Sequence, residues 1–301
     1  MLKQISLLIL CAVAIVLFTA PVQACTSAVV SGKVTPDGRP LLWKNRDTDF
    51  MRNHIDYVKG EMYNFIAVVN SANAYLKEAW MGTNSSGFVL MNTQSYNLVD
   101  VKGDEERGTA NGRVIYRALE VCATVEDFCH FLDTISKPSD IEANFGVIDA
   151  QGGAAMFEVD YHKYVMYDAN NPKDAPYGYI ARTNFSFAGK VNEGAGYVRY
   201  MEADQVLMKA SATGSITPQF IFNDLSRSFR NRIMDIDLRS GAYNRPQASG
   251  WFVDQDFIPR SSTSCSVVVQ GVKPGEKAEL TTMWTLLGYP PTGIAVPLWM
   301  K

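Results

Sequence analysis

Strand-like and helix-like stretches alternate in groups along this chain, and this order restricts the fold more than any single motif does. Short apolar, partly β-branched runs come first, followed by a pair of helical patterns, more strands, a second helical pair and final strands. Grouped runs of this kind are typical of α+β proteins, in which helices cover largely antiparallel sheets. The order is compatible with a four-layer αββα sandwich, although the pattern alone does not require one.

The start of this order can be assigned in more detail. Thr35-Pro36-Asp37-Gly38 is turn chemistry between two apolar runs, so we expect a β-hairpin with Cys25 at the head of its first strand. Thr124 followed by Asp127 predicts the N-cap of a helix. The full set of expected strands is 26–30, 40–43, 64–70, 88–92, 145–149, 154–159, 163–167, 266–269 and 278–286, and the expected helices are 111–123, 125–136, 196–210 and 218–232.

The first 24 residues have the features of a bacterial-type secretory signal. Lys3 supplies positive charge, residues 5–20 form an apolar run, and Pro21-Val22-Gln23-Ala24 offers small or medium residues before a cut. The apolar run is short for a membrane span, which needs about 20 residues. We therefore predict cleavage after Ala24 and a periplasmic or secreted protein without stable membrane insertion. A lipoprotein signal is the alternative, because Cys25 directly follows the leader.

Composition excludes several classes of protein. The 28 basic and 31 acidic residues give a net charge of −3 without a long run of either sign, so nucleic-acid binding has no electrostatic support. Five cysteines are too few for a disulfide scaffold, and no C-x-x-C pair indicates zinc. Cys122 and Cys129 are either bridged or, as we favour, two buried thiols. Nothing near the three histidines marks a partner for a catalytic thiol.

Cleavage after Ala24 would give Cys25 a thiol and an α-amine on the same carbon. The pKa of an α-amine is about 7.7–8.0 and that of a thiol about 8.5, so the amine can accept the thiol proton without a separate histidine. Charges gather nearby in Lys44-Asn45-Arg46-Asp47, where an apolar strand ends. A cation there can favour the thiolate, and a carboxylate can hold the ammonium. An exposed salt bridge at a strand end is the alternative interpretation.

These motifs together resemble a known superfamily. Cys25-Thr26-Ser27, then Asp37-Gly38, then a basic-Asn-x-Asp tetrad at 44–47 is similar to the N-terminal-nucleophile (Ntn) hydrolases that cleave linear amides. The resemblance is closest to the acyl-CoA:6-aminopenicillanic acid acyltransferase group, which is related to choloylglycine hydrolase and penicillin V acylase. It implies an αββα sandwich with two mostly antiparallel sheets, and a single catalytic domain over residues 25–301. It also implies that Cys25 attacks an amide carbonyl and that water or another amine resolves the thioester.

The resemblance implies roles for residues near the predicted nucleophile. Cys25 matches the nucleophile and base, and Asp47 matches the aspartate that flanks it. The arginine of the family tetrad falls on Lys44, which is a departure because lysine lacks the planar guanidinium fork. Arg46 is the alternative cation, and a register shifted by two residues would pair it with Asp49.

Three further matches lie outside the tetrad. Asn92 follows a turn and a short apolar strand, as does the asparagine whose amide stabilises the oxyanion in the family. Asn184, in Arg182-Thr183-Asn184-Phe185, fits a second family asparagine, and Arg260 fits a late arginine near a serine-rich strand start. Turn-capping is the alternative role for both asparagines.

The predicted partner is a small-molecule amide substrate, with no nucleic acid and with a homo-oligomer left open. No metal or organic cofactor is implied. Two alternatives stay open at this point. One is a lipid-anchored surface binding protein in which Cys25 carries the lipid, and the other is a related dipeptidase group that shares the Cys-Thr…Asp-Gly opening.

Overall fold

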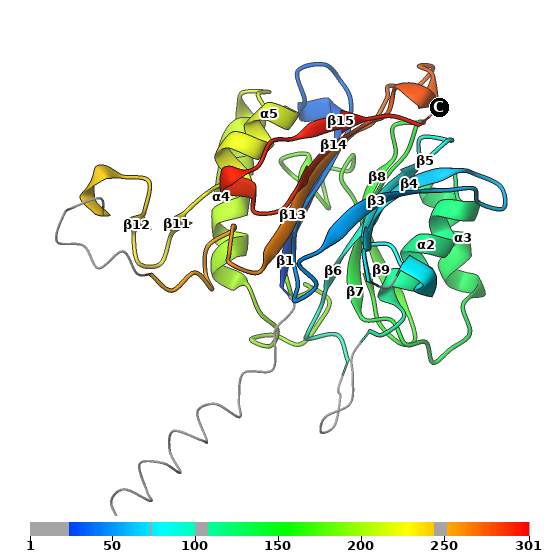
Figure 1. Cartoon of the computed structure of the whole chain (residues 1–301), viewed down its shortest axis with the longest axis horizontal. Helices are drawn as coiled ribbons and strands as arrows, with labels where there is room; N and C mark the ends of the chain where they lie inside the picture. Colours follow the sequence, from blue (N-terminus) through cyan, green and yellow to red (C-terminus); the bar gives the residue numbers. More distant parts are fainter. Residues whose placement is uncertain (1–23, 73, 100–107, 244–251, 301) are drawn as a thin grey trace, which may run out of the picture.

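Two antiparallel sheets stacked face to face, with helices outside them, form the body of the protein (Figure 1). The computed structural model describes residues 24–72, 74–99, 108–243 and 252–300, so the predicted leader lies outside it except for Ala24. Helices α2 and α3 cover one sheet, and α4 and α5 cover the other (Figure 1). The predicted α+β class and four-layer sandwich are confirmed.

The first sheet has six strands in the order β10-β1-β2-β13-β14-β15. Its central hairpin is the one that the Pro-Asp-Gly turn predicts, with Val30 opposite Leu41 and Cys25 opposite Arg46. The strands are β1 Cys25–Val30, β2 Leu41–Asp47, β10 Tyr179–Arg182, β13 Thr263–Gln270, β14 Thr282–Leu287 and β15 Val296–Leu298. Strand β14 is shorter than expected, because Ala278–Leu280 forms a 3-10 turn before it.

The second sheet has seven strands that follow one another in chain order, from β3 to β9. The strands are β3 Asn53–Val58, β4 Phe65–Asn70, β5 Met81–Asn84, β6 Val89–Gln94, β7 Ala143–Ile148, β8 Ala154–Val159 and β9 Tyr164–Asp168. The antiparallel meander expected after the first helical pair is β7, β8 and β9. Four strands of these two sheets are not predicted by the sequence pattern. Strand β3 is only half-buried and lacks a continuous apolar face, and β5, β10 and β15 are short.

The first helical pair is close to the prediction, with α2 at Asn111–Val121 and α3 at Val125–Thr134. Thr124 caps α3 as expected: its Oγ1 accepts from Asp127 N at 3.0 Å, while Asp127 Oδ2 accepts from Thr124 N at 3.0 Å. None of the helices in the described ranges is both long and apolar enough to cross a membrane.

The second pair is only half as predicted. Helix α4 spans Tyr197–Ala212, but the expected helix 218–232 is wrong beyond its first turns. Helix α5 is Pro218–Phe220 and continues as a π-helical turn at Ile221–Leu225. Ser226 then anchors the chain to the sheet, since its Oγ lies 2.8 Å from both Asn45 Oδ1 and Ser266 Oγ. The chain next forms a projecting hairpin of β11 Arg230–Asn231 and β12 Ile236–Asp237 (Figure 1).

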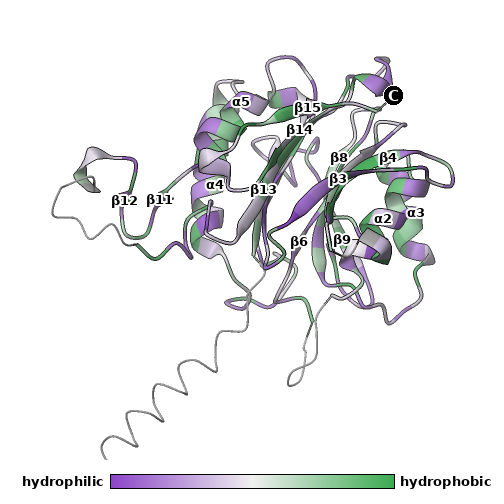
Figure 2. Ribbon diagram, in the orientation of Figure 1, coloured by the Kyte–Doolittle hydropathy of each residue, from purple (hydrophilic) through white to green (hydrophobic). Residues whose placement is uncertain are grey.

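Apolar side chains fill the space between the two sheets and beneath the helices. Figure 2 shows hydrophobic residues along the central strands and mixed colouring on the helices, as expected for helices with one buried face. The sheets approach closely at Gly146, where a Cβ atom would lie 2.3 Å from Met91 Cε and 2.8 Å from Leu42 Cδ1. Cys25, Cys122, Cys129 and Cys265 are all free thiols, so the bridged alternative for Cys122 and Cys129 is wrong. Cys122 is buried as predicted, whereas Cys129 is only half-buried.

Candidate active site

The register of three neighbouring strands brings Cys25 next to the charged tetrad. Cys25 on β1 is opposite Arg46 on β2, and Arg46 is opposite Cys265 on β13. Lys44 lies two residues before Arg46 and therefore on the same face of the sheet. Lys44 is 2% exposed, Arg46 3% and Asp47 1%. The tetrad is therefore buried, and its interpretation as a solvent-exposed salt bridge at a strand end is wrong.

The main-chain nitrogen of Cys25 is held by the side chain of Asn184. Cys25 N donates to Asn184 Oδ1 at 3.0 Å, and Asn184 Nδ2 donates to Gln94 O at 2.8 Å. The second bond fixes which end of the amide faces Cys25. In the described chain this nitrogen is the peptide nitrogen that follows Ala24, and it stands where the α-amine would lie after cleavage. The thiol Sγ lies 3.9 Å from Asp47 O.

Asp47 and Arg260, which are 213 residues apart in sequence, form a buried ion pair. Asp47 Oδ2 accepts from Arg260 Nε at 3.0 Å, and Asp47 Oδ1 accepts from Thr263 Oγ1 at 2.6 Å. Burial raises the pKa of the Asp47 carboxyl, while Arg260, Arg199 and the Thr263 hydrogen bond act in the opposite direction. The predicted residues Cys25, Asp47, Asn184 and Arg260 thus belong to one cluster.

Lys44 and Arg46 both face the buried cluster but contact different groups. Lys44 Nζ donates to Asn92 Oδ1 and to Trp80 O, both at 3.0 Å. Burial, together with nearby Arg46, lowers the pKa of Lys44 to about 8, and the Cys25 thiolate acts against that shift. Lys44 therefore links Asn92 to the cluster, and its bond to Asn92 Oδ1 leaves Nδ2 as the donor that could meet an oxyanion.

Arg46 takes the position directly across from the thiol. Its guanidinium donates to Asn53 and, at 2.9 Å, to Asn70 Oδ1, and it lies over the Trp80 ring at 4.6 Å from the centroid. Burial lowers the pKa of Arg46 to about 10. Asp49 is exposed, and the hydrogen bonds of Arg46 go to asparagines instead. The structure therefore does not support the shifted register that pairs Arg46 with Asp49.

Arg199 also belongs to the cluster, although it is not among the predicted site residues. Its NH1 donates to Cys25 O at 2.7 Å and to Thr26 Oγ1 at 2.8 Å, and its NH2 donates to Asn184 Oδ1 at 2.7 Å. Arg199 is 1% exposed, and burial lowers its pKa to about 10. A signal was present: Arg199 falls on the same helical stripe as the buried residues Ala203 and Leu207, where a charge needs a partner.

Other kinds of centre are not formed in the described part of the chain. No group of three or more His, Cys, Asp or Glu side chains there is arranged to hold a metal ion. His54 bonds to Ser71, His130 lies 3.8 Å from Glu126 on α3, and neither contact belongs to the cluster around Cys25. The arrangement instead offers a buried thiol with cations on its face of the sheet, and amide groups oriented by fixed hydrogen bonds.

Comparison with known proteins agrees with the fold. Residues 34–209, more than half of the chain, match the family model for acyl-coenzyme A:6-aminopenicillanic acid acyl-transferase. That range includes Lys44, Asp47, Asn92 and Asn184 but neither Cys25 nor Arg260, whose placement rests on the geometry above. No curated protein sequence matches the chain.

Three solved structures are similar at low sequence identity. A variant of conjugated bile acid hydrolase from Clostridium perfringens is 13% identical, with a TM-score of 0.52 and coverage of 91% of this chain and 92% of that one. Penicillin V acylase from Agrobacterium tumefaciens is 15% identical, with a TM-score of 0.48 and coverage of 92% and 86%. An N-acylethanolamine-hydrolyzing acid amidase ortholog from Caenorhabditis elegans is 14% identical, with a TM-score of 0.47 and coverage of 81% and 92%. At 13% identity, the similarity to the bile acid hydrolase supports the fold of this chain and carries no information about its substrate.

Proposed function

This chain belongs to the acyl-coenzyme A:6-aminopenicillanic acid acyl-transferase family and is an Ntn-type enzyme acting on amides, and on that basis we propose that Cys25 is its nucleophile. Removal of the leader would make Cys25 the first residue and turn its nitrogen into an α-amine. The observation that carries the proposal is the place of this nitrogen, 3.0 Å from Asn184 Oδ1 in a buried cluster that contains Asp47, Arg199 and Arg260.

In the proposed reaction the α-amine takes the thiol proton, directly or through one water, and Sγ attacks the amide carbonyl. The positive charges of Lys44 and Arg46 favour the thiolate, and Asn92 Nδ2 donates to the oxyanion. The C–N bond then breaks, and the ammonium returns its proton to the leaving amine. Water or a second amine attacks the thioester, frees the acyl group and restores the thiol. The negative charge of Asp47 stabilises the ammonium while it exists.

We expect the mature protein to begin with Cys25-Thr26-Ser27 and to be periplasmic or secreted. N-terminal sequencing of the protein purified from the producing cell tests this directly. A blocked or lipidated terminus would instead favour a lipid anchor, and palmitate labelling with detergent partitioning would detect it. An uncut leader would leave the nitrogen as a peptide group and remove the proposed base.

The substrate is proposed to be a linear amide with a small-molecule acyl group. The relatives named above act on a conjugated bile acid, on penicillin V and on N-acylethanolamines. A panel of these amides and N-acyl amino acids, assayed with and without a second amine acceptor, would separate hydrolysis from acyl transfer. Free-amine dipeptides belong in the same panel, because selective cleavage of those would favour the dipeptidase alternative.

The low pKa of Lys44 gives the activity an alkaline limit. Below pH 8 Lys44 is charged, and as the pH rises through about 8 it loses the charge that favours the thiolate. We therefore expect kcat/KM to fall above about pH 8, and Lys44→Arg to move this fall to higher pH, because arginine keeps its proton. Rate–pH profiles of the two proteins check this. Profiles that decline at the same pH would contradict a role for Lys44 in the limit.

A further inference from the structure

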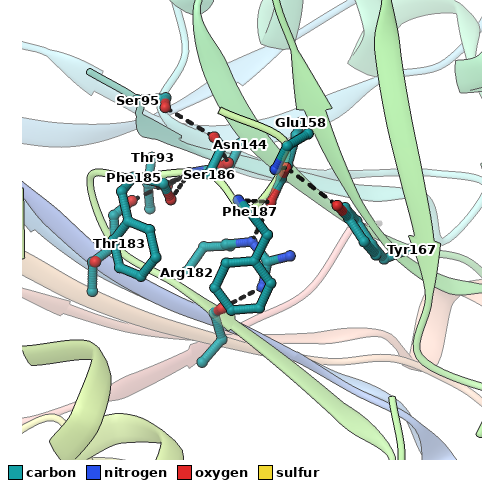
Figure 3. Close-up of polar contacts among 12 residues, drawn as sticks. Thr93, Ser95, Asn144, Glu158, Tyr167, Arg182, Thr183, Phe185, Ser186 and Phe187 are labelled. Carbon is teal, nitrogen blue, oxygen red and sulfur yellow. Dashed lines mark hydrogen bonds and ion pairs between the residues drawn. The ribbon is translucent and has the colours of Figure 1, made fainter. Parts of the chain in front are cut away.

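Two buried polar side chains of the second sheet hold the segment that carries Asn184 (Figure 3). This segment follows β10, at the edge of the first sheet. Asn144 on β7 and Glu158 on β8 are direct cross-strand partners, and they are 0% and 1% exposed. Neither residue is among the predicted site residues, and the hydrogen bonds described below for the two side chains do not include Cys25.

Asn144 holds the backbone on both sides of Asn184. Its Nδ2 lies 3.2 Å from the carbonyl oxygens of Thr183 and Phe185, the two sequence neighbours of Asn184. Its Oδ1 accepts from Ser186 Oγ at 2.6 Å. One side chain thus fixes the peptide plane directly before Asn184 and the peptide plane that follows Phe185.

Glu158 holds the same segment from further out. Its carboxylate accepts from Phe187 N at 2.8 Å and from Ala188 N at 2.7 Å. It also accepts from Arg182 Nε at 2.7 Å, and Arg182 itself lies between two rings, with Cζ 4.0 Å from the Phe187 centroid and 5.1 Å from that of Tyr167. The carboxylate therefore ties down the chain two residues before Asn184 and three and four residues after it.

A buried carboxylate is expensive to keep, and apolar packing would cover a loop at lower cost. What directed hydrogen bonds add is a single backbone conformation, since each donor and acceptor must lie in a set direction. We propose that Asn144 and Glu158 are positioning residues that hold Asn184 Oδ1 against the nitrogen of Cys25. The inference rests on the proposed function, in which that nitrogen is the base.

The test follows the reactivity of Cys25 in the mature protein, with iodoacetamide as the probe and mass spectrometry of the peptide that contains residue 25 as the readout. Glu158→Gln keeps the size of the side chain but replaces one acceptor oxygen with a donor, and Asn144→Asp removes the N–H groups that reach both carbonyls. Each is expected to slow alkylation of Cys25 at pH 7 about tenfold. This decrease is smaller than the one expected when a positioned base is removed, because these substitutions only displace the base. If one variant fails to fold, the other still gives the result.

The matched control is Asp149→Asn. Asp149 is a buried carboxylate at the far end of β7, 3% exposed, which accepts from the backbone N–H groups of Gln151, Gly153 and Val125. Like Glu158, Asp149 is buried and accepts from backbone N–H groups, but in the described part of the chain it has no contact with the Asn184 segment. We expect Asp149→Asn to lower the melting temperature and to leave the alkylation rate of Cys25 unchanged.

A double-substitution cycle identifies the route of the effect. If Glu158 acts through Asn184, then Glu158→Gln slows alkylation in the natural protein but adds nothing in an Asn184→Ala background. Equal slowing in both backgrounds, or a rate that is unchanged or raised in the Glu158 and Asn144 variants, would overturn the positioning role. If Asn184→Ala itself leaves the rate unchanged, the positioning role fails while the proposed function stands, because the nitrogen of Cys25 then acts without being held by Asn184. Amide turnover by Cys25→Ala would instead contradict the proposed function itself.

Discussion

Cys25→Ala is expected to abolish amide turnover while the protein still folds. The substitution removes one sulfur atom and leaves the α-amine, the cations and the amide donors in place, so the loss reports the nucleophile alone. Loss of a covalent nucleophile lowers kcat by at least about 10⁴-fold. Cys25 is 6% exposed, and removing its sulfur costs roughly 1–2 kcal/mol of stability. Initial rates on the best amide of the panel, together with thermal unfolding, measure both quantities.

Two further variants make this result specific. Cys129→Ala changes a half-buried thiol on α3 that contacts Met166, and it should leave turnover unchanged. Cys25→Ser keeps a hydroxyl group at the same position and should retain a small residual rate, because a hydroxyl is a weaker nucleophile than a thiol next to the same base. An active Cys25→Ala protein would exclude the thioester mechanism.

The parts of the fold that the sequence predicts are those determined by neighbouring residues. The Pro-Asp-Gly turn sets the β1–β2 hairpin, and the Thr124–Asp127 capping box starts α3. The same holds for the β7–β9 meander, whose separators are short. In each case the interaction that determines the structure joins residues close together in the sequence, so the local sequence pattern predicts the element.

The expected helix 218–232 fails for the opposite reason. Its apolar pattern is helical, but the chain is redirected at Ser226, which bonds to Asn45 and Ser266 on two different strands. Those partners are 181 and 40 residues away in the sequence, so the residues around Ser226 do not predict them. Strand β10 was missed in a similar way: it has four residues, and pairing with β1 defines it.

The site shows the same division. The Lys44–Asp47 tetrad is continuous in sequence and could be found there, whereas the choice between Lys44 and Arg46 could not be made, because both cations are buried and serve different partners. Arg199 shows the limit most clearly. Its charge on an apolar helical stripe indicates a buried partner, but only the packing of α4 on the first sheet identifies that partner as Cys25 and Asn184.

Asp47→Asn is expected to have the largest effect on stability. The Asp47 side chain is 0% exposed and that of Arg260 5%, so the substitution leaves a buried guanidinium without its carboxylate. Removing one partner of a buried pair costs about 3–5 kcal/mol. For a chain of this size that lowers the melting temperature by on the order of 10 °C. Thermal unfolding followed by circular dichroism measures the shift.

The neighbouring residue Asp49 supplies the control, because it is an exposed aspartate only two positions further along the chain. Asp49→Asn should change stability by less than about 0.5 kcal/mol, as is usual for surface substitutions. The double variant Asp47→Asn with Arg260→Gln should be less destabilised than the sum of the single variants, by about 0.5–3 kcal/mol, because the second substitution removes the cation that the first leaves unpaired. Additive losses would mean that Asp47 and Arg260 do not stabilise each other. Equal losses for Asp47→Asn and Asp49→Asn would mean that the buried Asp47–Arg260 pair contributes no more to stability than an exposed carboxylate does.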